Sequence, residues 1–289
     1  MLSAAAATPH PASFCAGAVS QKAAGPAAIT FRQVTQRFQS ASGQSFQALS
    51  ETDLTIADGE FVSIVGPTGC GKSTLLNIAA GLAMPVTGEV EIYGAPLTGR
   101  NERAGYLFQA ESLMPWNSAI DNIKLGLVFD GVPAGEAEER AQDWLERVGL
   151  AGHGHRYPHQ LSGGMRKRVA LAQVLIKNPR IILMDEPFSA LDIQTRTLME
   201  NELLNLWSED RKSIMFVTHD LEEAISMSDR VILLAAGPGS HPIAEFPIDL
   251  ERPRDVAEIR HTRAFADQHA MIWDALRAEV LKGYAQSKR

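Results

Sequence analysis

The chain has 289 residues and a formal net charge of −7 at pH 7, from 27 Lys and Arg residues and 34 Asp and Glu residues. This length suffices for one large α/β domain with a smaller lobe. The acidic balance argues against nucleic-acid binding, and no apolar stretch in the sequence is long enough to cross a bilayer. The two cysteines, Cys15 and Cys70, lie in an N-terminal tail and a glycine-rich loop. We therefore expect no structural disulfide and interpret Cys70 as a reactive thiol.

The first 28 residues are rich in Ala, Ser, Pro and Gly. This composition predicts a disordered extension that ends near Gly25-Pro26. The segment has neither a basic start nor a sustained apolar core, so we predict no signal peptide. The alternation in Ile29-Thr30-Phe31 then predicts the first strand of a folded domain.

A phosphate-binding loop follows the apolar run Phe61–Val65. It fits the pattern G-x-x-x-x-G-K-[ST] fully, as Gly66-Pro67-Thr68-Gly69-Cys70-Gly71-Lys72-Ser73-Thr74. A buried strand before it and an apolar helical pattern over Lys72–Leu82 give the expected context. Glycines let backbone N–H groups approach phosphate oxygens, and the helix N-terminus adds partial positive charge. We expect Lys72 to reach the β- and γ-phosphates of a nucleotide and Ser73 to ligate Mg²⁺.

The middle of the chain predicts a helical lobe. The segment Gly94–Gly105 is polar and turn-rich, and the pattern from Ser118 to Lys177 is helical, with an amphipathic helix over Glu136–Val148. The loop that follows this helix contains three histidines: His153, His155 and His159. They lie in a glycine-rich loop without a nearby cysteine, so we interpret this loop as solvated rather than as a metal site.

A second glycine-rich element, Leu161-Ser162-Gly163-Gly164-Met165, precedes a helix predicted from about Met165 to Lys177. A serine hydroxyl, bare backbone amides and a helix N-terminus together make an anion site. The alternative is a plain helix cap in which Ser162 only satisfies the first turn.

Two further strands end in polar residues. The apolar run Ile181–Met184 ends at Asp185, which a parallel strand would deliver to the sheet edge where ligands bind. We expect Asp185 to hold the Mg²⁺ shell and Glu186 to polarise an attacking water, rather than to form an ordinary acidic turn. His219 follows the run Ile214–Thr218 and is either a structural histidine or a γ-phosphate sensor.

With these motifs the chain resembles the ATP-binding subunit of an ABC transporter, over roughly Ile29 to Phe246. The family's motifs occur in order: the P-loop, Gln109 in Tyr106-Leu107-Phe108-Gln109, the signature Leu161–Met165 with Met in the last place, the Asp185-Glu186 pair, Ser189-Ala190-Leu191-Asp192, and Thr218-His219-Asp220. The resemblance implies an α/β P-loop NTPase fold of the ABC type. Its parts would be a RecA-like core, an antiparallel β subdomain and a helical lobe at about residues 110–178.

The resemblance also implies a composite site for ATP and Mg²⁺. In this family Ser162, Gly163 and Gly164 would contact the γ-phosphate bound to a second copy of the chain, with Asp192 beside them. Gln109 would touch the metal or the attacking water. Phe38 falls at the aromatic position that stacks on adenine, although an aromatic residue at a strand end is more often part of a core.

Two positions depart from the family pattern, because Lys167 stands where Gln is usual and Gln173 where Arg is usual. Neither is expected to touch the ATP chemistry directly. The departures concern the packing of the local helix and the charge of the interface.

Two segments resemble the nitrate, sulfonate and taurine import group: Leu113-Met114-Pro115-Trp116 and Asp249–Asp255. This resemblance implies an importer at the cytoplasmic face of the inner membrane, with separate permease subunits and a periplasmic solute-binding protein. Trp116 would be an apolar knob that fits a helix of the permease, or otherwise part of the lobe core. An exporter ATPase and a non-transport ABC ATPase are the alternatives. Residues 247–289 are predicted to form a C-terminal extension with an amphipathic helix over Ala264–Leu281.

Overall fold

The computed structural model describes residues 26–39, 43, 45–110, 112–189 and 191–287, and the side chains up to residue 285. The predicted disordered extension lies outside the described residues up to residue 25. The first strand, β1, begins at Ala27, two residues before the predicted start.

One sheet is antiparallel and has the strand order β2-β1-β4-β5. Its strands are β1 (Ala27–Gln39), β2 (Ser45–Ala57), β4 (Thr87–Ile92) and β5 (Ala95–Pro96). The two long strands pair along their whole length, from Ala27 opposite Ala57 to Gln39 opposite Ser45, with several register shifts between. Most residues of β1 and β2 away from their hairpin are buried, whereas Arg37–Gln39 and Ser45–Phe46 at the hairpin end are exposed.

The second sheet has the order β10-β9-β3-β8-β7-β6. Its strands are β3 (Phe61–Val65), β6 (Ala104–Leu107), β7 (Ile181–Asp185), β8 (Ser213–Val217), β9 (Arg230–Leu234) and β10 (Pro242–Pro247). All are parallel except β10, which pairs antiparallel with β9. Every residue of β3 and β8 is buried, which explains their continuous apolar runs. The predicted strands over 61–65 and 181–185 are confirmed.

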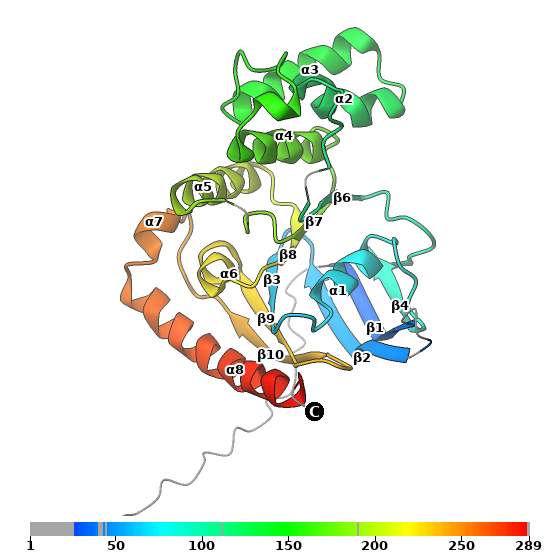
Figure 1. Cartoon of the computed structure of the whole chain (residues 1–289), viewed down its shortest axis with the longest axis vertical. Helices are drawn as coiled ribbons and strands as arrows, with labels where there is room; N and C mark the ends of the chain where they lie inside the picture. Colours follow the sequence, from blue (N-terminus) through cyan, green and yellow to red (C-terminus); the bar gives the residue numbers. More distant parts are fainter. Residues whose placement is uncertain (1–25, 40–42, 44, 111, 190, 288–289) are drawn as a thin grey trace, which may run out of the picture.

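Helices cover both faces of this second sheet (Figure 1). They are α1 (Lys72–Ala79), α5 (Ile193–Glu209), α6 (Leu221–Met227), α7 (Val256–Ile259) and α8 (Arg263–Ser287). Helix α1 ends three residues before the predicted Leu82. The cause is Gly81, which has a φ of 68° and approaches Gly99 so closely that a Cβ would lie 1.8 Å from the Gly99 carbonyl oxygen.

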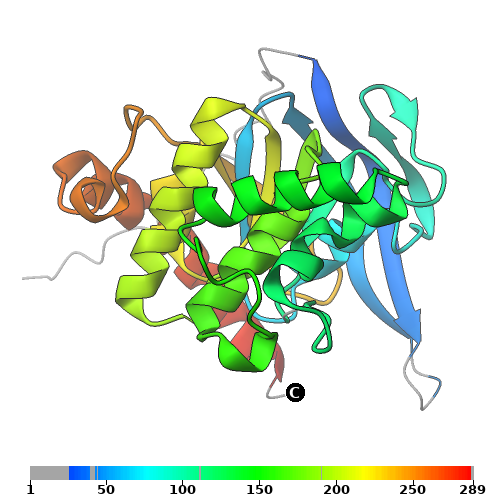
Figure 2. The same cartoon turned by 90° about the horizontal axis from the view of Figure 1, so that it is seen from above.

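The helical lobe lies between β6 and β7 in sequence and forms one end of the molecule (Figure 1). It contains α2 (Ala119–Phe129), α3 (Ala134–Arg147), a 3₁₀ turn (Pro158–Gln160) and α4 (Gly163–Leu175). These helices bury an apolar cluster of their own that includes Ile123, Leu145 and Val169. Seen from the lobe end, β1 and β2 lie on one side of the molecule and α7 on the opposite side (Figure 2).

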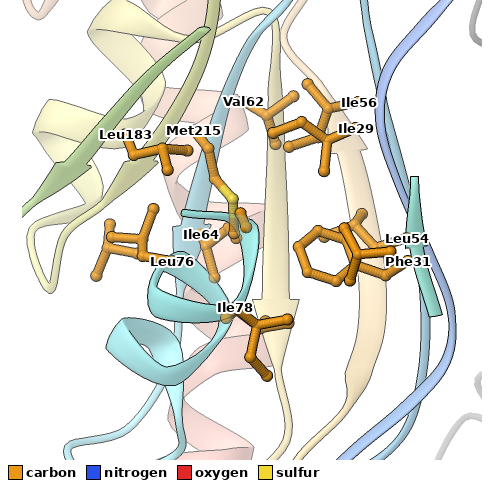
Figure 3. Close-up of a cluster of buried hydrophobic side chains, with 14 of the residues drawn as sticks. Ile29, Phe31, Leu54, Ile56, Val62, Ile64, Leu76, Ile78, Leu183 and Met215 are labelled. Atoms are coloured by element: carbon orange, nitrogen blue, oxygen red, sulfur yellow. The ribbon is translucent and has the colours of Figure 1, made fainter. Parts of the chain in front are cut away.

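Helix α1 lies between the two sheets and joins them through one core. Figure 3 shows the packing of side chains from β1, β2, β3, α1, β7 and β8: Ile29, Phe31, Leu54, Ile56, Val62, Ile64, Leu76, Ile78, Leu183 and Met215. Full burial of one such side chain stabilises a fold by about 1.5–3 kcal/mol. The loop before α1 is therefore anchored to this buried core.

The C-terminal extension packs on α6. Arg254 is buried and donates to the carbonyl oxygens of Ser228 and Leu250, at 2.7 and 2.8 Å. Burial lowers the pKa of Arg254 to about 10. Arg252 donates to the Met227 carbonyl oxygen. The Arg-Pro-Arg segment thus satisfies carbonyl groups where α6 ends.

In the part of the chain that the structure describes, no helix is both long enough and apolar enough to span a membrane.

Candidate functional site

The loop between β3 and α1 wraps around its own lysine. The Lys72 Nζ donates to the carbonyl oxygens of Gly66 and Pro67, at 2.9 and 3.0 Å, and the side chain is buried. Gly69 and Gly71 have φ values of 78° and 90°, which favour glycine. An ammonium group and a helix N-terminus at the same turn make a strongly anion-attracting cradle.

Cys70 lies inside this loop and is fully buried. Burial raises the pKa of its thiol, and the charge of Lys72 only partly opposes this effect. A buried, protonated thiol is a poor nucleophile. The expectation of a reactive thiol is therefore wrong for this structure. A Cβ at Gly66 would lie 2.9 Å from the Cys70 sulfur, so the thiol instead fills the space behind the loop.

A hydroxyl group and a carboxylate group meet at the end of the phosphate-binding loop. Ser73 Oγ donates to Asp185 Oδ1 at 3.0 Å, across 112 residues of sequence. Burial raises the pKa of Asp185, and the charge of Glu186 adds to this effect, whereas the Ser73 bond opposes it. A hydroxyl and a carboxylate suit a hard cation such as Mg²⁺, which would also favour the ionised carboxylate. The amide of Gln109 instead contacts Glu186, the residue that follows Asp185.

Glu186 receives contacts from both neighbouring strands. Gln109 Nε2 donates to Glu186 Oε2 at 3.2 Å, and His219 Nδ1 lies 3.1 Å from the same oxygen. Gln109 follows β6, Glu186 follows β7 and His219 follows β8, which are adjacent parallel strands. Their carboxyl ends therefore bring the three side chains together, as expected for an open α/β sheet.

The backbone holds Glu186 in an unusual conformation. Its φ is 44°, its N–H donates to the Val217 carbonyl oxygen at 2.9 Å, and its own carbonyl accepts from Ser189 Oγ at 3.0 Å. A positive φ at a residue other than glycine costs free energy and persists where surrounding contacts enforce it. The carboxylate is thus pre-positioned at the end of β7, where it could accept a proton from a water molecule.

A cavity of about 700 Å³ adjoins the loop. Its lining includes the loop residues Gly66–Gly69, His219, and Phe46 of β2. This volume is within the usual range for small-molecule sites. Phe38 is not among the lining residues, although it pairs across the strands with Phe46. Sequence reasoning missed Phe46, because no local pattern shows which of the two paired aromatic residues reaches the cavity.

The signature element lies elsewhere. Ser162 caps α4, since its Oγ accepts from the Met165 N–H at 3.3 Å. None of Ser162, Gly163 and Gly164 lines the cavity. A Cβ at Gly164 would lie 2.6 Å from Thr195 Cγ2, so the start of α4 touches the start of α5. The structure therefore does not bring the two phosphate-binding elements of one chain together.

Asp192 caps α5 and accepts from the Thr195 N–H at 3.0 Å. This backbone bond lowers the pKa of Asp192. Asp192 is not part of the cavity lining, and its neighbour Ala190 lies outside the described residues. The two predicted contacts to a second copy, Ser162–Gly164 and Asp192, are thus both caps of neighbouring helices.

Lys167 lies closer to the carboxylate cluster than the sequence indicated. It is buried, and its Nζ donates to the Gln109 carbonyl oxygen at 2.8 Å. Because the Gln109 side chain contacts Glu186, the departure from the family pattern lies one residue from the carboxylate cluster. The sequence predicted effects on helix packing and interface charge at this position, and it did not predict this bond to the Gln109 backbone.

Trp116 is 72% exposed. It does not belong to the buried cluster of the lobe. The alternative interpretation of this residue as lobe core is therefore wrong, and an apolar side chain projects from the lobe surface.

Comparison with known proteins agrees with the resemblance to ABC transporter ATP-binding subunits. The sequence matches the ABC transporter family over residues 49–189. It is 45% identical to an uncharacterized ABC transporter ATP-binding protein of Methanocaldococcus jannaschii, over 83% of this chain and 88% of that protein. It is 37% identical to the taurine import ATP-binding protein TauB of Roseobacter denitrificans, over 88% and 97% of the two chains. The TauB of a Yersinia pestis strain is 43% identical, over 68% and 77%.

Solved structures give the same fold. The ATP-binding cassette MJ0796, in a dimeric post-hydrolysis state with ADP and Pi, has a TM-score of 0.69 and 34% sequence identity. It matches 77% of this chain and 100% of its own length. The predicted fold, a P-loop NTPase domain of the ABC type, is confirmed. By these relatives and this fold, the chain belongs to the ABC transporter ATP-binding proteins and is an ATPase whose hydrolysis is coupled to transport.

Proposed function

We propose that this chain is the motor subunit of an ABC importer and that two copies close head to tail over two ATP molecules. The observation that carries this proposal is the separation of Ser162–Gly164 from the cavity beside Gly66–Thr74. Each element can bind phosphate, and a second copy could bring its signature to the first copy's loop. The dimeric cassette among the similar structures supports this arrangement.

Within one copy, different residues bind the nucleotide and activate the attacking water. Lys72 and the loop amides bind the phosphates, while Phe38 or its cross-strand partner Phe46 offers an aromatic surface for the base. Glu186 polarises the attacking water. Gln109 and His219 hold the Glu186 carboxylate through the contacts at 3.2 and 3.1 Å. Both side chains would therefore change their contacts when the γ-phosphate binds or leaves.

Ser73, Asp185 and Gln109 would hold Mg²⁺. The oxygen donors of these side chains fit a hard cation, and the raised pKa of Asp185 indicates a buried carboxylate that a cation would stabilise in its ionised form. When bound, the ion would neutralise phosphate charge.

The relatives that are named as taurine importers support an import role for this chain. We therefore propose a small, anionic solute of the sulfonate, nitrate or taurine kind, delivered by a periplasmic solute-binding protein to a separate permease. The chain would lie at the cytoplasmic face of the inner membrane. The exposed Trp116 at the lobe surface suits a groove that receives a permease helix. An ABC exporter remains the second candidate, because the cassette chemistry would be the same.

The dimer is tested with Glu186→Gln. This variant should still bind ATP, and its turnover should fall about 10²- to 10⁴-fold, because the neutral amide cannot accept a proton from water. With hydrolysis blocked, ATP should convert the protein to dimers, detected by size-exclusion chromatography with light scattering. The double variant Glu186→Gln with Lys72→Ala should stay monomeric. Wild-type turnover in Glu186→Gln would refute the water-activation role.

The permease contact is tested in solubilised membranes. A tagged wild-type chain should copurify with an integral-membrane permease and a solute-binding protein, identified by mass spectrometry. Trp116→Ala should lose most of this copurification, whereas Met84→Ala, an exposed apolar residue outside the lobe, should not. Copurification without any solute-binding protein would favour the exporter.

A further inference from the structure

The cavity beside the phosphate-binding loop has a wall that comes from the C-terminal helix. Besides the loop and His219, its lining includes five residues of α8: Trp273, Leu276, Val280, Gly283 and Tyr284. In Figure 1, α8 runs along the edge of the core and ends beside β10. None of the ABC motifs in the sequence includes this helix, so its place at the cavity has no role in the site described above.

Helix α8 is a fixed part of the fold. Its residues Phe265, Ile272 and Leu276 are buried with side chains of α6 and β9. The buried carboxylate of Glu279 accepts from the Ala236 N–H at 2.9 Å. This bond ties α8 to the segment 236–238, which also lines the cavity.

The segment 236–238 in turn lies against the phosphate-binding loop. A Cβ at Gly237 would lie 3.5 Å from the Gly69 carbonyl oxygen. The wall formed by α8 therefore has a fixed position relative to the loop.

Trp273 is placed differently from the anchoring residues. It is 47% exposed and does not belong to the buried cluster that holds α8. Its ring stacks on His269, with the centroids 6.5 Å apart and the planes inclined by 9°. The indole thus lies parallel to the His269 ring and presents about half of its surface to solvent at the edge of the cavity.

The chemistry of the cavity changes from one part to another. The loop and His219 provide polar, anion-binding groups, whereas Phe46, Pro238 and Trp273 provide aromatic and apolar surface. A nucleotide has the same division, because its phosphates are anionic and its base has flat apolar faces. A free phosphate would need only the polar groups of the loop and His219.

We propose that α8 forms the outer wall of the nucleotide site and that Trp273 contacts the base of the bound ATP. This inference rests on the nucleotide site proposed above. It adds a determinant that selects a nucleoside triphosphate over a bare polyphosphate, and it places that determinant in the C-terminal extension.

The test compares two ligands by isothermal titration calorimetry in the presence of Mg²⁺: ATP and inorganic tripolyphosphate, which has no base. Trp273→Ala should weaken ATP binding about tenfold, the size expected for one base–aromatic contact. Tripolyphosphate binding should be unchanged. Trp273→Phe should keep most of the ATP affinity. The matched control is Met271→Ala, since Met271 lies on the same helix, is 59% exposed and does not line the cavity.

Equal ATP affinity of Trp273→Ala and the wild type would overturn the proposal. Equal weakening of both ligands would also overturn it, because the substitution would then act on the phosphate-binding loop. Lys72→Ala separates this inference from the proposed site itself. It should weaken both ligands, and unchanged binding of both would count against the phosphate-binding role of the loop, whatever Trp273 does.

Discussion

The two phosphate-binding elements of this chain, Gly66–Thr74 and Ser162–Gly164, both begin helices but have different surroundings. The first follows β3 and lies between the two sheets. Its Lys72 donates to two carbonyl groups of the loop. Side chains from three strand ends lie beside it. The second lies in the lobe, where Ser162 caps α4 and no carboxylate cluster adjoins it among the described residues.

This difference shows that one chain contains the complete carboxylate cluster, whereas its signature element lacks catalytic partners among the described residues of the same chain. The cluster of Gln109, Glu186 and His219 forms without any partner, because parallel strands converge at one edge. The signature has the backbone chemistry of an anion site but no catalytic group of its own. A site shared between two copies accounts for both regions, and the following experiments test that account.

The largest effect is expected from mixing two inactive variants. Lys72→Ala removes the ammonium from the loop, and Ser162→Asp adds a negative charge that repels phosphate while it keeps a good helix cap. Each variant alone should lose nearly all ATP turnover. If the site is shared, a heterodimer of the two contains one intact site. An equimolar mixture should recover roughly a quarter of wild-type turnover, because random pairing gives heterodimers half of the time.

The control for this experiment is Ser162→Asn, which is also a good cap but adds no charge. It should retain more turnover than Ser162→Asp. Phosphate release is measured before and after the variants are mixed. No recovery in the mixture, with both variants folded, would contradict the shared site. Full activity of Ser162→Asp alone would show that the signature serves only as a cap.

A smaller effect is expected at the contact that joins the two regions. Lys167 lies on the signature helix α4 and donates to the Gln109 carbonyl oxygen at 2.8 Å. Lys167→Met keeps the length of the side chain but removes the donor, so the Gln109 carbonyl loses a bond to a charged group. Turnover should fall about tenfold at saturating ATP.

Lys167→Gln is the matched variant, because its amide can still donate a hydrogen bond. It should keep most of the turnover. ATP affinity should change little in either variant, since Lys167 does not line the cavity. Unchanged turnover in Lys167→Met would show that the bond to Gln109 does not position the Q-loop.

The comparison also separates what the sequence could predict from what it could not. The P-loop, the strand that ends at Asp185 and the position of His219 were predictable, because each is one local pattern: a glycine-rich loop or a buried strand followed by polar residues. The convergence of Gln109, Glu186 and His219 followed from the parallel order of the strands. These parts of the fold depend little on packing between residues that are distant in sequence.

Other parts depend on packing between distant segments. Phe46 rather than Phe38 lines the cavity, although the two residues are directly paired across two 13-residue strands. Which of them reaches the cavity depends on where this strand pair lies relative to the phosphate-binding loop, and no local pattern specifies that position. The reach of Lys167 to Gln109 spans 58 residues of sequence. The position of Trp273 depends on how α8 docks on α6. Neither periodicity nor spacing contains this information.

The smallest effect is expected where the signature touches the next motif. A Cβ at Gly164 would lie 2.6 Å from Thr195 Cγ2, whereas a Cβ at Gly163 would meet only the flexible end of Arg166, at 3.9 Å. Gly164→Ala should therefore destabilise the fold by about 1–3 kcal/mol. Gly163→Ala should be neutral or slightly stabilising, since alanine favours helices. Thr195→Ser removes the clashing methyl group and should recover the stability of Gly164→Ala in a double-mutant cycle, measured by thermal unfolding. Equal stability of Gly163→Ala and Gly164→Ala would show that α4 and α5 are not in tight contact. The signature could then move without affecting Asp192, and the two regions would be less coupled than the structure indicates.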